Sequence, residues 1–365
     1  MVILPVFNTL ATKKMRALRK IATILVAAIL FIAIFIAYST LTEFNPEPTK
    51  TEYSSNSPDT INLSSEITLT TWNIGYGGLG ANMDFFYDNG KKTRDTKENT
   101  IANLDSIKGW LTKRNSTNFF LLQEVDFGSQ RSYNIEQLGY IAESLTTHNK
   151  VIAFNYLVGF VPVPISSPMG HVSSGLALLS NPNPKSAVRV SYPGSYAWPK
   201  KLFMLRRCML VNRYPTSNGK ELVVINTHKS AFDDGSLKQQ EMDKMKQLIE
   251  NEYNLGNYVI VGGDWNQAPP SFSLTTFGSN YQVEFFKLMN INTNFMPQDW
   301  QWVYDEKKPT NRYLNEPYQK GKTYETILDF FLVSPNIEVI SCSTTNLNFK
   351  YSDHNPVSIS VRLKE

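Results

Sequence analysis

The chain has 365 residues, 42% hydrophobic and 12% aromatic, which is enough for a substantial core and for one large domain or two ordinary ones. Its net charge of +4 comes from the first 20 residues, which contain no acidic side chain and five basic ones: Lys13, Lys14, Arg16, Arg19 and Lys20. Without them, 31 basic residues face 32 acidic ones, so bulk charge does not mark the remainder as a nucleic-acid-binding protein.

The chain has only two cysteines, Cys208 and Cys342, which excludes a disulfide framework. Their strand-like surroundings favour buried free thiols over a single bridge.

An uncharged apolar run of 18 residues, from Ile21 to Tyr38, follows the basic segment. At about 1.5 Å per helical residue it approaches the roughly 30 Å core of a bilayer. Because the basic flank comes first, we expect the N-terminus in the cytoplasm and the rest of the chain outside. A cleaved signal peptide is the competing interpretation, although its apolar region is usually only about 7–15 residues long. Both interpretations export the remainder.

The chain is therefore divided into four parts. Residues 1–20 are expected to be a basic cytoplasmic N-terminus and residues 21–38 a transmembrane signal anchor. Residues 39–65 contain Pro46, Pro48 and Pro58 among many Ser, Thr and Asn residues, which is typical of a polar linker. Residues 66–365 are expected to form one folded domain.

The first elements of this domain alternate between strand and helix. Apolar and polar residues alternate over Ile67–Trp72, which predicts a strand. Residues 75–92 are rich in glycine and aromatic residues and are predicted to form a long loop. A capping box of Asp95 and Glu98 predicts a helix, because apolar residues follow it at helical spacing. Phe119–Leu122 is predicted to be a buried strand.

Later segments continue this alternation and predict a mixed α/β sheet protein. Ser236 and Gln239 can cap a helix that carries Met242, Met245 and Ile249. Further strands are predicted at Ser174–Leu179, Leu222–Ile225, Tyr258–Val261, Thr326–Val333 and Val357–Val361.

Short polar clusters lie in or directly after several of these strand-like runs. Their carboxylates, carboxamides and histidines, without thiolates, suit a hard divalent cation such as Mg²⁺. Such sites commonly move or hydrolyse phosphate groups. We therefore expect one polar site at the rim of a buried sheet. The clusters are Trp72-Asn73-Ile74, Gln123-Glu124, Asn226-Thr227-His228, Gly263-Asp264-Trp265-Asn266, Leu328-Asp329-Phe330 and Ser352-Asp353-His354-Asn355.

These motifs, in this order, resemble the endonuclease/exonuclease/phosphatase superfamily, which includes deoxyribonuclease-I-like nucleases, AP endonucleases, neutral sphingomyelinases and inositol-phosphate 5-phosphatases. Gly-Asp-Trp-Asn at 263–266 and Ser-Asp-His-Asn-Pro at 352–356 are specific when found together. The resemblance covers about Ile67 to Leu363. It implies a four-layered α/β sandwich, with two packed mixed β-sheets flanked by helices.

The resemblance also implies a role for each polar residue. Glu124, Asn73 and Asp353 look like the metal-binding residues, with Mg²⁺ as the expected ion and Mn²⁺ as the alternative. Asp264 and Asn266 match the pair that orients the attacking water and the scissile phosphate. Three further residues resemble catalytic groups of the family. His354 is similar to the histidine that contacts the phosphate, and Asp329 to the carboxylate that orients this histidine. His228 matches a second histidine of the nuclease and sphingomyelinase branches.

Elementary chemistry supports part of this assignment. Asp329 lies between Leu328 and Phe330 in an apolar run, where a carboxylate needs a partner. A histidine fixed by a carboxylate keeps a raised pKa and can donate to an oxyanion. Asp264 can take a proton from water as a general base.

Other residues carry weaker signals. Arg207 contacts phosphate in one interpretation and belongs to a solvated surface pair with Arg206 in the other. His171 precedes a segment that often borders the cleft of the family, and His148 is expected at the surface. Residues 84–87 form either a substrate-facing lid or surface packing. No residue matches the cleft tyrosine of AP endonucleases, and the 75–92 loop is long for the nuclease branch.

The sequence thus predicts a membrane-anchored, exported, divalent-metal-dependent phosphoesterase that hydrolyses phosphodiester bonds in nucleic acid or in a phospholipid head group. Two alternatives stay open: a non-catalytic surface binding or scaffold protein, and a phosphomonoesterase with a soluble substrate. The expected partners are the phosphodiester substrate and the membrane, through the N-terminal helix. No obligate protein partner is expected.

Overall fold

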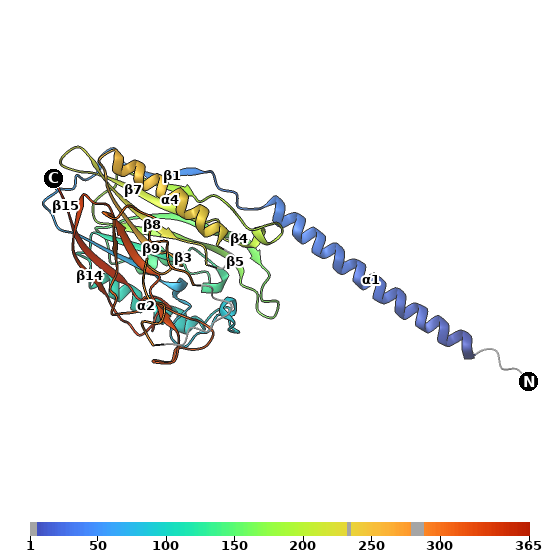
Figure 1. The fold of residues 1–365 in the computed structure, drawn as a ribbon. Helices are drawn as coiled ribbons and strands as arrows, with labels where there is room; N and C mark the ends of the chain where they lie inside the picture. Colours follow the sequence, from blue (N-terminus) through green and yellow to red (C-terminus); the bar gives the residue numbers. More distant parts are fainter. Residues whose placement is uncertain (1–5, 232–234, 279–287) are drawn as a thin grey trace, which may run out of the picture.

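The computed structural model describes residues 6–231, 235–278 and 288–365. Two β-sheets pack face to face with helices on their outer sides (Figure 1). One sheet runs in the order β1 (Thr49–Ser54), β6 (Ser186–Ser191), β7 (Cys208–Pro215), β8 (Glu221–His228), β9 (Tyr258–Asp264), β13 (Asp329–Val333), β10 (Gln301–Val303). The other runs in the order β14 (Ile337–Thr344), β15 (Val357–Leu363), β2 (Ile67–Asn73), β3 (Phe119–Asp126), β5 (Gly170–Ser180), β4 (Asn149–Val161).

Each sheet is mixed, as the sequence predicted. β2 and β3 are parallel in one sheet and β8 and β9 in the other, and the other paired strands of both sheets are antiparallel. A separate two-stranded ribbon joins β11 (Asn311–Arg312) to β12 (Glu325–Thr326).

Alternate side chains of each strand enter different layers. Leu121 of β3 lies in the core between the sheets, whereas Phe120 and Leu122 pack under the helices. Helix α2 (Lys97–Thr112), with α3 (Gln137–Ile141), covers the six-stranded sheet, and α4 (Ser236–Asn254) covers the seven-stranded one. This arrangement confirms the predicted four-layered sandwich.

Several boundaries differ from the predictions. The N-cap of α2 is Thr96, whose hydroxyl accepts from Asn99 N, while Asp95 braces the turn from one residue earlier. The N-cap of α4 is Gly235 rather than Ser236. His148, expected at the surface, is buried, and its Nε2 lies 2.8 Å from the carbonyl oxygen of Thr117. Both cysteines are free, Cys208 in the core and Cys342 half-buried.

The N-terminal part also contains more structure than a linker. Helix α1 (Val6–Leu41) projects from the domain, and its Thr12–Leu41 portion is long and apolar enough to cross a membrane (Figure 1). Within the expected linker, β1 pairs with the edge strand β6, and Ile61 reaches the core between the sheets. The folded part therefore begins before Glu66, because an edge strand can be polar on both faces and still be held by its backbone.

Candidate active site

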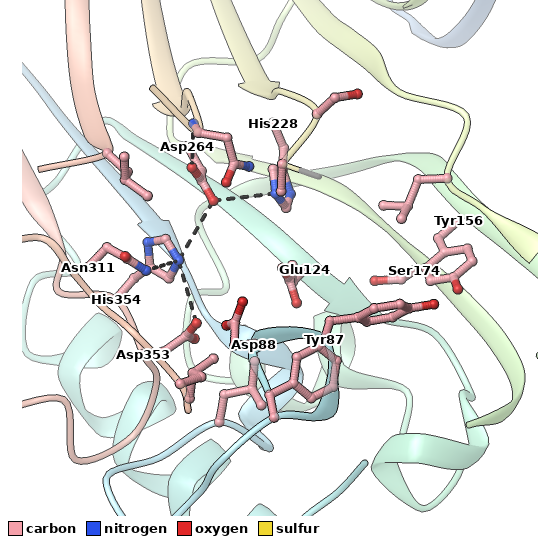
Figure 2. A pocket seen from close by; sticks show the side chains of 18 of the residues that line it. Tyr87, Asp88, Glu124, Tyr156, Ser174, His228, Asp264, Asn311, Asp353 and His354 are labelled. Atoms are coloured by element: carbon pink, nitrogen blue, oxygen red, sulfur yellow. Dashed lines mark hydrogen bonds and ion pairs between the residues drawn. The ribbon is translucent and has the colours of Figure 1, made fainter. Parts of the chain in front are cut away.

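Polar side chains gather at the edge where the two parallel strand pairs end. In register, Asn73 of β2 lies opposite Gln123 of β3, and His228 of β8 lies opposite Asp264 of β9. Because the sheets are stacked, these strand ends border a single cleft (Figure 2). Most of the residues singled out from the sequence line this cleft: Glu124, Arg207, His228, Asp264, Asn266, Asp353 and His354.

Glu124 enters the cleft at a bulge in β3. The register with β5 shifts between Leu122 and Val125, and the backbone of Glu124 is left-handed, with φ at 53°. A bulge re-aims the side chain at its position. The Oε1 of Glu124 accepts a hydrogen bond of 3.3 Å from Asn73 Nδ2, which also donates to Asp264 Oδ2 at 3.0 Å. Asn73 therefore joins the groups contributed by the two sheets.

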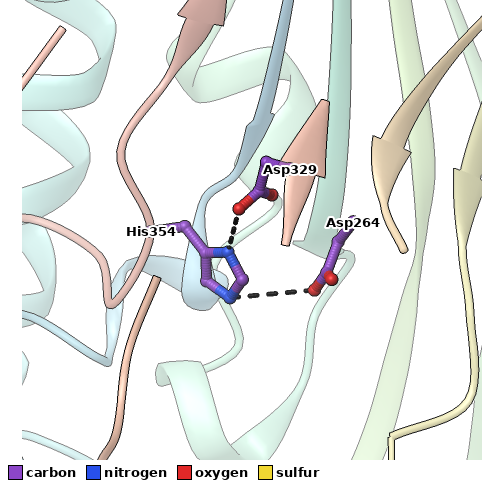
Figure 3. Close-up of side chains that lie close together, drawn as sticks. All are labelled: Asp264, Asp329 and His354. Atoms are coloured by element: carbon purple, nitrogen blue, oxygen red, sulfur yellow. Dashed lines mark hydrogen bonds and ion pairs between the residues drawn. The ribbon is translucent and has the colours of Figure 1, made fainter. Parts of the chain in front are cut away.

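His354 is held between two carboxylates (Figure 3). Its Nδ1 lies 2.7 Å from Asp329 Oδ2, and its Nε2 lies 3.7 Å from Asp264 Oδ2. The loop that carries the ring is fixed on both sides. Trp72 Nε1 donates to the carbonyl oxygen of His354 at 3.0 Å, and His354 N donates to the hydroxyl of Ser352 at 3.1 Å. The imidazole is thus oriented before any substrate binds.

Asp264 is the centre of the polar network. Its Oδ2 lies 3.3 Å from His228 Nε2, and its Oδ1 accepts from Asn266 N at 2.9 Å. Asn266 follows in a left-handed turn, with φ at 49°, and its Nδ2 donates to the carbonyl oxygen of Lys229. The turn places one carboxylate, one carboxamide and two imidazoles around the same point of the cleft.

A model of the Endonuclease/Exonuclease/phosphatase family matches residues 70–354, a span that includes these groups. The chain belongs to this family. The sequence resemblance is thereby confirmed. No curated protein sequence matches the chain.

Solved structures of the endonuclease/exonuclease/phosphatase family share the fold at low identity. A family protein from Beutenbergia cavernae is 16% identical, with a TM-score of 0.51, over 82% of this chain and 72% of that one. One from Leptotrichia buccalis is 13% identical, with a TM-score of 0.51, over 81% of this chain and all of that one (100%). One from Bacteroides vulgatus is 14% identical, with a TM-score of 0.50, over 82% and 100%.

The two histidines of this site are driven in opposite directions. Burial lowers the pKa of His354, but Asp329, Asp353 and Asp264 outweigh it and raise the pKa well above the ordinary value. Burial, followed by the charges of Arg207 and His354, lowers the pKa of His228 well below that value. The site therefore contains one imidazolium and one neutral imidazole at neutral pH.

The carboxylates beside them fit a divalent cation. Burial raises the pKa of Glu124 and of Asp353, and the nearby negative charge of Asp353 adds to the rise for Glu124, as that of Asp264 does for Asp353. A cation bound between them would stabilise both ionised forms. Asn73 is less free to bind it, since its Oδ1 already accepts from Gly75 N at 3.0 Å.

A second group of side chains could also hold a metal. One ligand atom each from Asp264, Asp329 and His354 lies within 4.8 Å of the others. The Nδ1 of His354 already shares a hydrogen bond with Asp329, so this group is better suited to orienting the imidazole than to surrounding an ion. The oxygen-rich pair of Glu124 and Asp353 fits Mg²⁺ better.

The two substrate-binding candidates differ. Arg207 lines the cleft, and its buried Nη1 has no hydrogen-bond partner among the described residues, which leaves it available to an anion. His171 is exposed on β5 and is not one of the residues that line the cleft. The structure therefore brings Arg207 to the site and leaves His171 outside it.

Several cleft residues carried no sequence signal. Asn311 Nδ2 lies 3.0 Å from His354 Nε2, and Asp88 enters the cleft from the 75–92 loop (Figure 2). Arg131 forms a two-bonded ion pair with Asp126, and its guanidinium stacks 3.9 Å from the ring centre of Tyr76. No motif contains these residues, and they lie in segments without a periodic pattern.

Proposed function

We propose that this chain is a membrane-anchored, exported phosphodiesterase that depends on a divalent metal, Mg²⁺ or Mn²⁺. The observation that carries this proposal is the position of Asp264 between His228 and His354, whose pKa values are shifted in opposite directions. Membership of the family supports phosphoester hydrolysis as the reaction class. Paired groups with separated pKa values are the usual means of supplying both an acid and a base at neutral pH.

The reaction transfers a phosphoryl centre from an alcohol to water. The water oxygen bonds to phosphorus, one P–O ester bond breaks, and the leaving alkoxide takes a proton. Asp264 accepts the proton of the attacking water, with Asn266 fixing the carboxylate and His228 bordering the water position. The imidazolium of His354, held by Asp329, donates to a phosphate oxygen as negative charge develops there.

A metal held by Glu124 and Asp353 would supply Lewis-acid stabilisation of the phosphate oxygens. Arg207, which lines the same cleft, adds a guanidinium for the anionic ester. The phosphate oxygen that receives the proton of His354 is the one that leaves as the alcohol.

The membrane assignment rests on α1. Its side chains in the candidate span are exposed in the isolated chain, and basic residues precede the apolar run. The positive-inside rule therefore orients the N-terminus to the cytoplasm and the catalytic domain to the other side. A domain held outside the cytoplasm meets lipid head groups and extracellular nucleic acid.

The test uses the full chain in detergent with bis-p-nitrophenyl phosphate, with Mg²⁺, Mn²⁺ or a chelator. We expect metal-dependent turnover, its loss in Asp264→Asn and in His354→Gln, and little change in His171→Gln, which is the matched control. Equal turnover by wild type and Asp264→Asn would overturn the assignment. Preference for p-nitrophenyl phosphate over the diester would make the chain a monoesterase.

A further inference from the structure

The end of α1 packs against the catalytic domain. Phe35 stacks on Phe203, with ring centres 5.7 Å apart, and meets Phe160 edge-on at 6.2 Å. Trp198 Nε1 donates to Thr40 Oγ1 at 3.3 Å. These contacts fix one face of the domain next to the candidate membrane span.

Charged contacts extend the attachment just beyond the helix. Glu43 pairs with Arg206 and, at 3.1 Å, with Lys201, and Arg206 Nε also donates to the carbonyl oxygen of Phe44. An isolated flexible tether would make no such contacts. The orientation of the domain relative to α1 is therefore defined by side chains on both.

The depth of this contact follows from helix geometry. Phe35 lies three residues before Tyr38, the end of the uncharged apolar run, which corresponds to about 4.5 Å along the axis. If α1 spans a bilayer, the aromatic rings that touch Phe35 must lie at the boundary between head groups and acyl chains. Phe160 and Phe203 belong to the catalytic domain, so the domain itself reaches this boundary.

Exposed apolar side chains surround the contact. Ile165, at the tip of the β4–β5 hairpin, is 91% exposed, Trp198 is 58% exposed and Phe160 is 44% exposed. Lys200 and Lys201 lie in the same segment as Trp198. We call these five residues the docking surface. Figure 1 shows the β4–β5 end of the domain on the side where α1 enters.

The chemistry of the docking surface matches a lipid bilayer. Large exposed apolar side chains next to a candidate membrane span mark an interaction site, and tryptophan is enriched at the membrane interface. Lys200 beside them is attracted to anionic head groups, whereas Lys201 is already paired with Glu43. No protein partner has to be invoked, because α1 already brings the bilayer to this face.

The same elements form one wall of the cleft. Tyr156 of β4, Met169 at the base of the hairpin tip, and Tyr196, Met204 and Leu205 of the segment around Trp198 all line it. This wall is largely apolar and belongs to the same segments as the docking surface, and His354 and Asp264 lie across the cleft from Tyr156 (Figure 2). A substrate with a phosphodiester and an apolar tail would satisfy both walls.

We propose that the docking surface inserts into the bilayer interface and that the substrate is a phosphodiester lipid of that bilayer. The substrate part rests on the proposed function, whereas the docking part does not. Nucleic acid is the competing substrate. It is disfavoured because the chain beyond residue 20 has no net positive charge.

Insertion is tested without catalysis. The full chain carrying Ile165→Cys and Cys342→Ser is labelled with an environment-sensitive fluorophore and reconstituted into phosphatidylcholine vesicles with nitroxide-labelled lipid. We expect a blue-shifted emission quenched by the nitroxide. Leu255→Cys in the same background is the control, since Leu255 is 65% exposed but lies beside the start of β9, the opposite end from Asp264. Equal solvent exposure of both labels would overturn docking.

Turnover then separates the two proposals. We expect Ile165→Asp to lower hydrolysis of phosphatidylcholine or sphingomyelin in vesicles about tenfold or more, without affecting bis-p-nitrophenyl phosphate. Leu255→Asp should leave both unchanged. Turnover of bis-p-nitrophenyl phosphate and of an oligonucleotide, but of neither lipid, would overturn the lipid substrate while retaining the phosphodiesterase. If bis-p-nitrophenyl phosphate, the oligonucleotide and both lipids were all left unhydrolysed, the proposed function itself would be overturned.

Discussion

Asp264 and Asp329 lie opposite each other in the antiparallel pair of β9 and β13, and His354 is held between their carboxylates. The pairing brings together two carboxylates that are 65 residues apart in sequence, and Figure 3 shows the imidazole reaching both. Asp329 lies on the buried side and Asp264 on the cleft side. One carboxylate therefore sets the charge and direction of the ring, while the other faces the cleft.

We expect Asp329→Asn to lower kcat/KM by about 100-fold or more, because His354 loses the charge that raises its pKa. Activity that needs the imidazolium falls as pH rises through the pKa of His354. That decline should therefore move to lower pH in the variant. The measurement is the pH profile of kcat/KM on a soluble diester.

Asp105→Asn is the matched control, since Asp105 lies at the surface of α2 and its carboxylate accepts a hydrogen bond from the hydroxyl of Tyr140. A uniform loss at every pH, with no shift of the alkaline limb, would show that Asp329 acts on structure alone.

The raised pKa of His354 also affects the stability of the fold. Its ion pair stabilises the fold below about pH 6.5 and loses this contribution as pH rises through the folded-state pKa.

Metal affinity should depend on Glu124. Glu124→Gln is expected to weaken Mg²⁺ or Mn²⁺ binding by about 10- to 100-fold or more, measured by titration calorimetry on the full chain. Glu98→Gln, on the exposed face of α2, should bind normally. Unchanged affinity in Glu124→Gln, with loss in Asp329→Asn, would place the ion instead among Asp264, Asp329 and His354.

The cleft carboxyl groups should make the metal-free protein sensitive to pH. Burial raises the pKa of Asp88 to about 7, with repulsion from Asp353 adding to the rise. Because the folded value lies above the unfolded one, the native state holds an extra proton between about pH 4 and pH 7. The contribution of Asp88 to the free energy of unfolding therefore falls as pH rises through that window.

Asp88→Asn removes the destabilisation that comes from ionising the buried carboxyl of Asp88. With a chelator present, we expect the variant to match wild type in melting temperature near pH 4 and to exceed it at pH 8. Mg²⁺ should narrow the difference at pH 8, because the cation stabilises the ionised carboxyls. If the variant differed from wild type in melting temperature by the same amount at pH 4 and at pH 8, the raised pKa of Asp88 would be contradicted.

A buried ion pair supports the floor of the site. Arg131→Ala removes the two hydrogen bonds of 3.0 and 2.8 Å that Arg131 donates to the carboxylate of Asp126, and it removes the guanidinium from the ring of Tyr76. We expect a loss of roughly 3–5 kcal/mol in the free energy of unfolding, from chemical denaturation. Arg362→Ala, which breaks a surface pair with Glu338, should cost less than about 1 kcal/mol.

Most residues singled out from the sequence come together in the structure because their motifs follow strands whose alternation is visible. Asn73 and Asp264 come at the ends of apolar runs, and the fold needs only to align those ends. Arg131 and Asn311 could not be found in this way. Arg131 lies in a short 3₁₀ turn and Asn311 in a two-residue strand, so neither has a periodic pattern, and tertiary packing alone brings them to the cleft.

The same reason explains why β1 was not predicted. Its sequence, TKTEYS, is polar on both faces and gives no hydrophobic alternation, since one edge of the strand faces solvent. His171 illustrates the converse. It lies within β5, as the second residue of the strand, but its side chain is exposed and does not line the cleft. Proximity in sequence to a cleft strand does not decide which way a side chain faces.

The position of β1 leads to a test of the domain boundary. A chain that begins at residue 46 keeps β1, whereas one that begins at Glu66 loses β1 and the core contacts of Tyr53, Ile61 and Leu63. Burial of one apolar side chain contributes about 1.5–3 kcal/mol, so we expect the shorter chain to be less stable by at least about 2 kcal/mol. Both chains lack α1, so their free energies of unfolding can be compared in denaturant without detergent. Equal stability would mean that β1 adds nothing and that the polar segment behaves as a linker after all.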